Sequence, residues 1–145
     1  MFLLLLIQRK GEHFMDMTIT FPGGKKVEAS YKGFTIQTDQ PGAVGGDDSA
    51  LEPFSLFLVS LGTCAGYYIL SFCQQRNIPT QDIHLVLHIQ RDKTTHMVTE
   101  IETEIHVPHD FPETYLNAVV KASETCAVRK HIEHPPQFHT KIIRP

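Results

Sequence analysis

The residues in this sequence best suited to redox chemistry are three cysteines, Cys64, Cys73 and Cys126. A thiolate is a nucleophile and can be oxidised reversibly to a sulfenic acid or a disulfide. Cys64 and Cys73 fall on one predicted helix, where their spacing places them on opposite sides and roughly 13.5 Å apart along the axis. A disulfide needs Cα atoms within about 7 Å. An intrachain bond is therefore open only to Cys64 with Cys126 or to Cys73 with Cys126.

The spacing of the residues indicates neither a metal site nor a nucleotide site. The chain has nine histidines, and His131 and His134 could share a helix face, but no cysteine lies within four residues of another, as structural zinc sites require. Two further sets alternate along predicted strands and are interpreted as solvent-facing: His84 with His88, and Glu100 with Glu102 and Glu104. Neither a Gly-x-Gly-x-x-Gly motif, a Walker loop nor a Gly-x-Ser-x-Gly elbow occurs. We therefore expect no metal and no cofactor.

Composition limits the class of protein. A chain of 145 residues with 20% charged and 41% apolar residues fits one folded domain, not a disordered chain or a coiled coil. Its 13 basic and 16 acidic residues give a net charge of −3, which argues against a broad nucleic-acid-binding face. Three cysteines cannot complete a disulfide framework, so we expect a reducing, cytoplasmic location.

The N-terminal segment, residues 1–14, is treated as an extension separate from the domain. Phe2 to Ile7 are apolar, but the basic start, the length and the cleavage site of a signal peptide are incomplete. Met15 and Met17 stand just before a strand pattern. Two interpretations remain open: a start codon placed too early, or an additional edge strand or helical extension.

The elements that must position the cysteines begin with strands. Alternation over residues 17–38, interrupted at Pro22-Gly23-Gly24 and Lys32-Gly33, predicts a three-stranded meander with one buried face. Residues 39–52 are then predicted to be an irregular loop. Loops of this length are usually functional or disordered.

A long helix is predicted from Pro53 to Arg76 and carries Cys64. No charged residue occurs between Glu52 and Arg76, and apolar residues occupy nearly the whole circumference. A helix of this kind must be buried all round, so a second subunit or a membrane has to cover it. The polar Ser and Thr residues within it favour a soluble homodimer and no membrane, with the Gly62-x-x-x-Gly66 pair allowing two helices to cross closely.

The rest of the chain is predicted to form a hairpin, a second helix and a strand. Alternation over residues 82–107 indicates two antiparallel strands with one solvated face. The second helix follows, with Asp110 and Glu113 as a cap pair and an end near His134, because Pro135-Pro136 cannot continue it. Residues 137–143 are predicted to form a last short strand.

Two segments resemble the OsmC/Ohr family. The first runs from Gly45 to Cys64, where a Pro-led helix carries a cysteine after a run ending in small residues. The second is Cys126-Ala127-Val128-Arg129-Lys130-His131, which resembles the family's second-cysteine segment. The order of predicted elements also matches over residues 17–143. The resemblance implies a single α+β domain over residues 15–145, with antiparallel sheets around two long central helices in an intertwined homodimer.

The resemblance also implies an activity in the oxidative stress response. Cys64 would attack an organic hydroperoxide and become a sulfenic acid, and Cys126 would then form a disulfide with it. An external dithiol would reduce that bond. The alternative is a non-catalytic member that binds an apolar ligand or partner at the dimer cleft.

The charged residues of the family site are not all in place. Family enzymes have a glutamate nine or ten residues before the reactive cysteine, where this chain has Ser55 and Phe54. The nearest carboxylate is Glu52. Lys32, Arg129 and Lys130, from either subunit, remain as alternatives for the cation that stabilises the Cys64 thiolate.

Overall fold

The computed structural model describes residues 15–144, which divide into two compact units at Pro53 and Phe54. The two units are described separately below. The predictions made for residues 1–14 lie outside the described residues.

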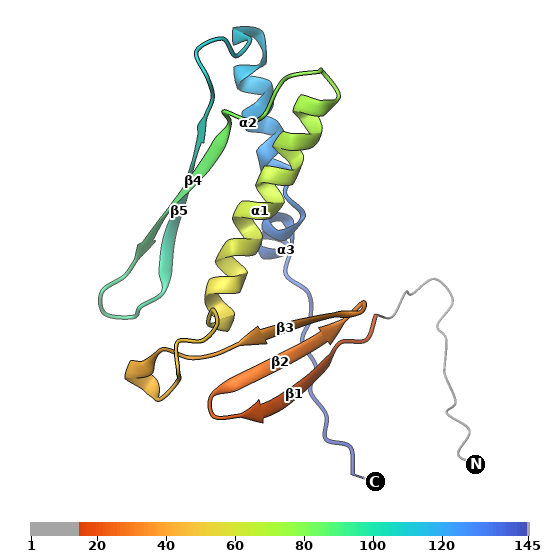
Figure 1. Ribbon diagram of the computed structural model, residues 1–145, viewed down its shortest axis with the longest axis vertical. Coiled ribbons are helices and arrows are strands. Elements are labelled where there is room, and N and C mark those ends of the chain that lie inside the picture. Colours follow the sequence, from red (N-terminus) through yellow and green to blue (C-terminus); the bar gives the residue numbers. More distant parts are fainter. Residues whose placement is uncertain (1–14, 145) are drawn as a thin grey trace, which may run out of the picture. The chain divides into compact units, whose positions relative to one another are not determined.

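The first unit contains the predicted meander. Strands β1 (Thr18–Gly23), β2 (Lys26–Tyr31) and β3 (Phe34–Thr38) form an antiparallel sheet in the order β1-β2-β3 (Figure 1). Lys32 and Gly33 connect the paired residues Tyr31 and Phe34 with φ angles of 50° and 81°, as expected for a two-residue hairpin turn. The expected buried face is wrong for the single chain, because Phe34 stays 74% exposed.

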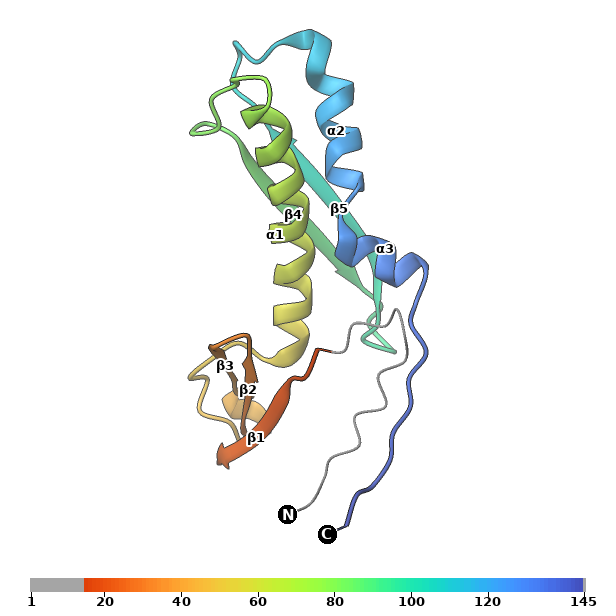
Figure 2. The ribbon, with the colours of Figure 1, turned by 90° about the vertical axis from the view of Figure 1, so that its right-hand side faces the viewer.

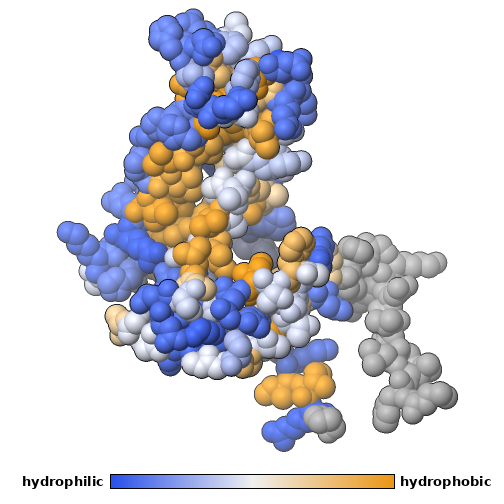
Figure 3. Space-filling view, in the orientation of Figure 1, coloured by the Kyte–Doolittle hydropathy of each residue, from blue (hydrophilic) through white to orange (hydrophobic). Residues whose placement is uncertain are grey.

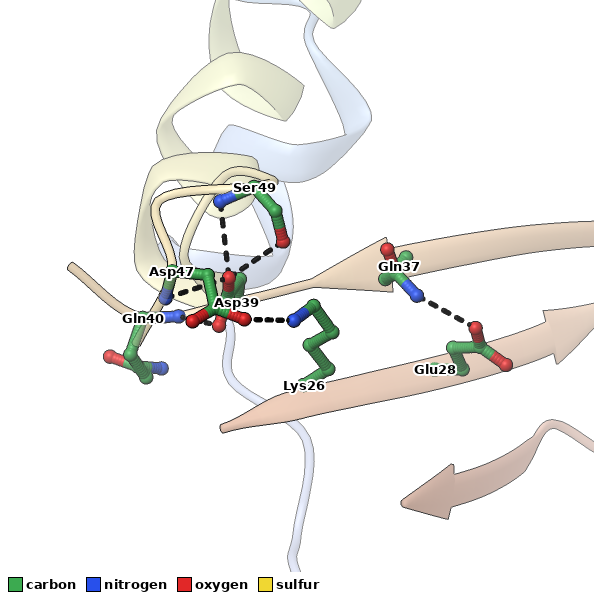
Figure 4. A network of polar contacts seen from close by, with 7 residues as sticks. All are labelled: Lys26, Glu28, Gln37, Asp39, Gln40, Asp47 and Ser49. Carbon is green, nitrogen blue, oxygen red and sulfur yellow. Dashed lines mark hydrogen bonds and ion pairs between the residues drawn. The ribbon is translucent and has the colours of Figure 1, made fainter. Parts of the chain in front are cut away.

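The loop after β3 is held by one buried carboxylate, Asp39. Oδ2 of Asp39 accepts hydrogen bonds from Ser49 Oγ at 2.6 Å and from the backbone N–H groups of Ser49 and Asp47, each at 3.1 Å (Figure 4). The Ser49 hydroxyl contributes most to a pKa of Asp39 well below its usual range. Gly46 is required here, since a Cβ would lie 1.8 Å from the carbonyl oxygen of Gln40. The loop is therefore ordered around Asp39.

The second unit joins a long helix to a hairpin, as predicted. Helix α1 (Pro53–Gln74) is followed by β4 (His84–Arg91) and β5 (Val98–His106), which pair antiparallel. In both ribbon views α1 runs along the hairpin (Figures 1 and 2). Gly62 of α1 faces Leu87 of β4, because a Cβ built at this glycine would lie 3.4 Å from the Leu87 side chain.

The predicted second helix is wrong as a single element. The segment forms a 3-10 turn (Glu113–Tyr115), α2 (Leu116–Glu124) and α3 (Ala127–Glu133). The break falls at Cys126, whose ψ of 121° is extended. The Asp110–Glu113 cap pair is also wrong, because Pro112 precedes the 3-10 turn and no side chain caps it. The strand expected over residues 137–143 does not form, since none of the described strands pairs with it.

The core of the second unit is small, and much of α1 lies outside it. Buried side chains of α1, the 107–112 segment and α2 form the core cluster: Ile69, Cys73, Phe111 and Val119. Only Ile69 and Cys73 of α1 are buried, whereas Tyr67 is 63% exposed. Figure 3 shows hydrophobic residues gathered where α1 runs. Within the described residues, α1 is the one helix long and apolar enough to cross a membrane, a test that core helices of soluble proteins also pass.

Candidate active site

The fold brings Cys64 and Cys126 together, although 61 residues separate them in the sequence. Cys64 lies half-buried in the middle of α1, and Cys126 is the residue immediately before α3. The thiol of Cys126 donates a hydrogen bond to Cys64 and also lies 3.9 Å from the carbonyl oxygen of Leu61. Of the two intrachain pairings left open by the sequence, this is the one whose sulfurs are in contact.

The two sulfurs also cap α3. Cys126 Sγ accepts the backbone N–H of Arg129 at 3.5 Å, the position of an N-cap side chain. Cys64 accepts the N–H groups of Ala127 and Val128. The first three N–H groups of α3, which have no partner within a helix, are thus directed at the cysteine pair.

Cys64 is the more acidic thiol of the pair. Burial is the largest single influence and raises its pKa. Hydrogen bonds from Val128 N–H, the Cys126 thiol and Ala127 N–H together outweigh burial, so the pKa of Cys64 lies below its ordinary value. Such bonds favour the charged form because they are stronger to a thiolate than to a thiol.

Cys126 is shifted in the opposite direction. It is only 2% exposed, and burial raises its pKa above the ordinary value. The Arg129 N–H opposes this shift, but the neighbouring Cys64 adds to it. The arrangement therefore makes the Cys64 thiol easier to deprotonate than the Cys126 thiol.

Two hollows lie within the second unit. The larger, about 550 Å³, lies between α1, the hairpin and α2–α3, and Cys126 forms part of its wall with Leu61, Leu87 and Arg129. The smaller, about 490 Å³, is lined by Phe54, Phe57 and Ile132 among others. Both walls are mainly apolar, so either hollow suits an uncharged organic group.

Comparison with known proteins identifies the family. The family model for OsmC-like proteins matches residues 46–141. The chain belongs to the OsmC-like family. A search among curated proteins gives no match.

Solved structures of OsmC-like proteins share the fold. A Psychrobacter arcticus protein assigned to osmotic stress induction and detoxification response is 20% identical, with a TM-score of 0.71 over 88% of this chain and 93% of that chain. An OsmC-like protein from Mycoplasma pneumoniae is 15% identical, with a TM-score of 0.66 over 86% and 90%. A Legionella pneumophila organic hydroperoxide resistance protein is 16% identical, with a TM-score of 0.56 over 85% and 91%.

Two of the residues predicted as the cation beside Cys64, Arg129 and Lys32, make contacts within their own units of this OsmC-like protein. Arg129 pairs with Glu133, Nε to Oε1 at 2.9 Å, and lies 4.0 Å from Glu124. Lys32 belongs to the first unit, where its Nζ lies 5.1 Å from the centre of the Tyr31 ring.

The roles expected for Glu52 and Lys130 stay predictions. Glu52 precedes α1 in the first unit, and Lys130 is an exposed residue of α3. Within the chain, the groups that lower the Cys64 pKa are backbone N–H groups and a thiol. Backbone donors leave no signal in the residue types, so the sequence pattern indicated a cation and not these N–H groups.

The histidine and glutamate sets are on the solvated face of the hairpin, as predicted. His84 and His106 stack with ring centres 4.5 Å apart, and Glu104 lies 2.9 Å from His106 and 3.4 Å from His88. The bonds to His106 and His88 hold the pKa of Glu104 below its ordinary value. Among the described residues, no three potential ligands are placed to hold a metal ion.

Cys73 packs in the core of the second unit. It is fully buried with Ile69, Phe111 and Val119, and burial raises the pKa of its thiol. A thiol in this environment is a poor nucleophile. The structure thus separates Cys73 from the other two cysteines.

Proposed function

We propose that this protein is a thiol-dependent peroxidase that reduces organic hydroperoxides. The Cys64 thiolate attacks the terminal oxygen of the hydroperoxide, the O–O bond breaks, and the alcohol leaves after taking up a proton. Cys64 becomes a sulfenic acid. The Cys126 thiol then attacks the Cys64 sulfur, a disulfide forms and water leaves. An external dithiol reduces the disulfide by exchange.

The observation that carries this proposal is the asymmetric cysteine pair. A two-cysteine peroxidase needs one cysteine that attacks as the thiolate and a second thiol close enough to form a disulfide with the resulting sulfenic acid. The pKa of Cys64 is lowered and the pKa of Cys126 is raised, while the two sulfurs remain in contact. Membership of the OsmC-like family and a fold shared with an organic hydroperoxide resistance protein support a peroxide-related role.

Organic rather than hydrogen peroxide is the proposed substrate class. The hollow that Cys126 borders has about 550 Å³ of space and walls that include Leu61 and Leu87. An apolar group of a hydroperoxide would be removed from water there, whereas hydrogen peroxide has no such group. This difference favours the organic substrate.

We also propose that the protein works as a homodimer in the cytoplasm. Apolar side chains of α1 remain exposed in the single chain, among them Phe54 at 42% and Val59 at 47%. A second copy would cover them without placing charged strands in a membrane. Light scattering should give twice the chain mass at micromolar concentration, and a stable monomer would contradict this part of the proposal.

The cytoplasm is proposed because the dithiol chemistry requires a reducing compartment.

The function is tested by the rate of peroxide consumption. With cumene hydroperoxide and excess dithiothreitol, wild type should turn over, and Cys64→Ser should not. Cys73→Ala is the matched control, because it removes a thiol that is not in contact with the pair, and it should retain turnover. Equal rates for wild type and Cys64→Ser would contradict the proposal.

The second candidate is a non-catalytic protein that binds an apolar ligand. The hollow beside Cys126 favours it, because binding there needs no thiol chemistry. The two candidate functions differ in whether wild type consumes peroxide. A protein that only binds an apolar ligand should consume no peroxide as wild type or as Cys64→Ser, and both should bind an apolar probe with the same affinity.

A further inference from the structure

Helix α3 depends on the cysteine pair for its N-terminal cap. It spans Ala127–Glu133 and has no buried residue. Its first three N–H groups are accepted by sulfur: those of Ala127 and Val128 by Cys64, and that of Arg129 by Cys126. A helix of two turns with little packing is marginal in water, so its cap decides much of its stability.

The acceptors change when the pair is oxidised. In the reduced form the α3 N–H groups lower the pKa of Cys64 and favour its thiolate, and hydrogen bonds to a charged acceptor are about twice as strong as neutral ones. In a disulfide the same sulfur is neutral and a weak acceptor. The Cys126 sulfur, which accepts the Arg129 N–H at 3.5 Å, would itself be bonded to Cys64.

Access to the pair depends on the same helix. Cys126 is 2% exposed, so a dithiol has little access to the Cys126 sulfur of a disulfide while α3 stays in place. Arg129, Ile132 and Glu133 of α3 form one side of the hollow that Cys126 borders. Loosening α3 would open this side and bring the disulfide within reach of a reductant.

We propose that α3 is a redox-sensitive lid, which the reduced cysteine pair holds closed and the Cys64–Cys126 disulfide releases. In the oxidation, the two thiols lose two protons and two electrons, and a hydroperoxide takes them up to give an alcohol and water. Dithiol exchange returns both thiols and closes the lid. The proposal rests on the proposed function for its oxidant in the cell.

Other contacts determine how far the lid opens. Within α3, Arg129 pairs with Glu133 and the N–H of Lys130 bonds to the carbonyl oxygen of Cys126 at 3.1 Å. The disulfide itself would tie Cys126 to α1. These contacts keep α3 attached at its first residue, so the expected change is faster opening of the helix, not its removal from the unit.

Amide hydrogen exchange on the full chain tests the lid. The disulfide is made with diamide, an oxidant that needs no peroxidase activity, and is verified by mass spectrometry. Amides of residues 130–134 should exchange about fivefold to tenfold faster in the oxidised than in the reduced protein, which corresponds to the loss of one good cap. The hairpin β4–β5 should exchange equally in both forms.

Two serine variants serve as controls. Cys126→Ser keeps an N-cap acceptor and cannot form the bond, so diamide should leave its α3 exchange unchanged, and Cys64→Ser should behave in the same way. Equal or slower exchange of α3 in the oxidised wild type would overturn the lid. Failure of diamide to join Cys64 to Cys126 would also overturn it. Faster α3 exchange without peroxide turnover would instead reject only the proposed function.

Discussion

Replacing Ala127 with proline should remove one of the two backbone donors that stabilise the Cys64 thiolate. Ala127 is the first residue of α3, where proline is well tolerated because its fixed φ suits a helix start. Proline also requires the preceding residue to be extended, and Cys126 already has a ψ of 121°. The variant therefore deletes a single N–H group with little disturbance of the backbone.

The expected change in the Cys64 pKa is about one unit upward. A hydrogen bond to a charged group contributes about 1.5–3 kcal/mol, and one pKa unit corresponds to about 1.4 kcal/mol. Cys64 is only half-buried, so solvent replaces part of the lost bond and the lower end of that range applies. At neutral pH, where the remaining thiolate limits the rate, alkylation of Cys64 should slow by up to about tenfold.

The pKa is measured from the pH dependence of Cys64 alkylation by iodoacetamide, followed on the Cys64 peptide by mass spectrometry. Ala127→Ser is the matched control, because it changes the side chain and keeps the N–H group. Circular dichroism verifies that both variants retain their helices. An Ala127→Pro protein that keeps its helices and the wild-type Cys64 pKa would refute the assignment of the α3 backbone as the thiolate partner.

Three further predictions concern the stability of the two units. Asp39→Asn should lower the free energy of unfolding at neutral pH. Because the pKa of Asp39 is lowered in the folded state, the stability that its carboxylate contributes is present above about pH 4 and is lost as the pH falls further and the carboxylate is protonated. Denaturation of wild type and variant at a series of pH values will show this loss. Cys73→Ala should lower stability by about 1–2 kcal/mol in urea denaturation and leave peroxide turnover unchanged, and loss of turnover in a folded variant would contradict the core role. Gly62→Leu should lower the stability by about 1–3 kcal/mol, because the new side chain would press against Leu87. Gly66→Leu should be tolerated by the single chain, because no described residue lies within 4 Å of a Cβ at that position. Equal losses of stability in the two variants would contradict this packing.

The regular elements were predictable because their periodicity is strong. Alternation gave the meander and the hairpin, and the uncharged run after Pro53 gave α1 to within two residues of its end at Gln74. In each case the pattern repeats over the whole element, so the prediction does not depend on a single residue.

The break at Cys126 was not predictable from the same patterns. Neither glycine nor proline marks it, and the apolar spacing continues from α2 into α3. The break depends on tertiary contacts, because Cys126 turns out of the helix where its sulfur meets Cys64. The donors of Ala127 and Val128 were missed for the same reason: they become available only once the helix restarts.

The exposed apolar faces show a different limit. The sequence indicated that α1 and the meander each bury apolar side chains, yet Tyr67 and Phe34 remain largely exposed in the single chain. A pattern of apolar residues predicts that a face is buried from solvent, but it does not predict whether the same chain or a second molecule buries it. The Asp39 loop shows the same limit for polar residues, since its contacts join positions 8 and 10 residues apart.

The central claim is that Cys64 and Cys126 form the redox-active pair, and disulfide mapping tests it most directly. Fully reduced protein is treated with one equivalent of cumene hydroperoxide, blocked with N-ethylmaleimide, digested and analysed by mass spectrometry. In wild type we expect a disulfide between Cys64 and Cys126, with Cys73 recovered as a blocked thiol. In Cys126→Ser we expect a sulfenic acid on Cys64. All three cysteines recovered as blocked thiols, with the peroxide unconsumed, would contradict it.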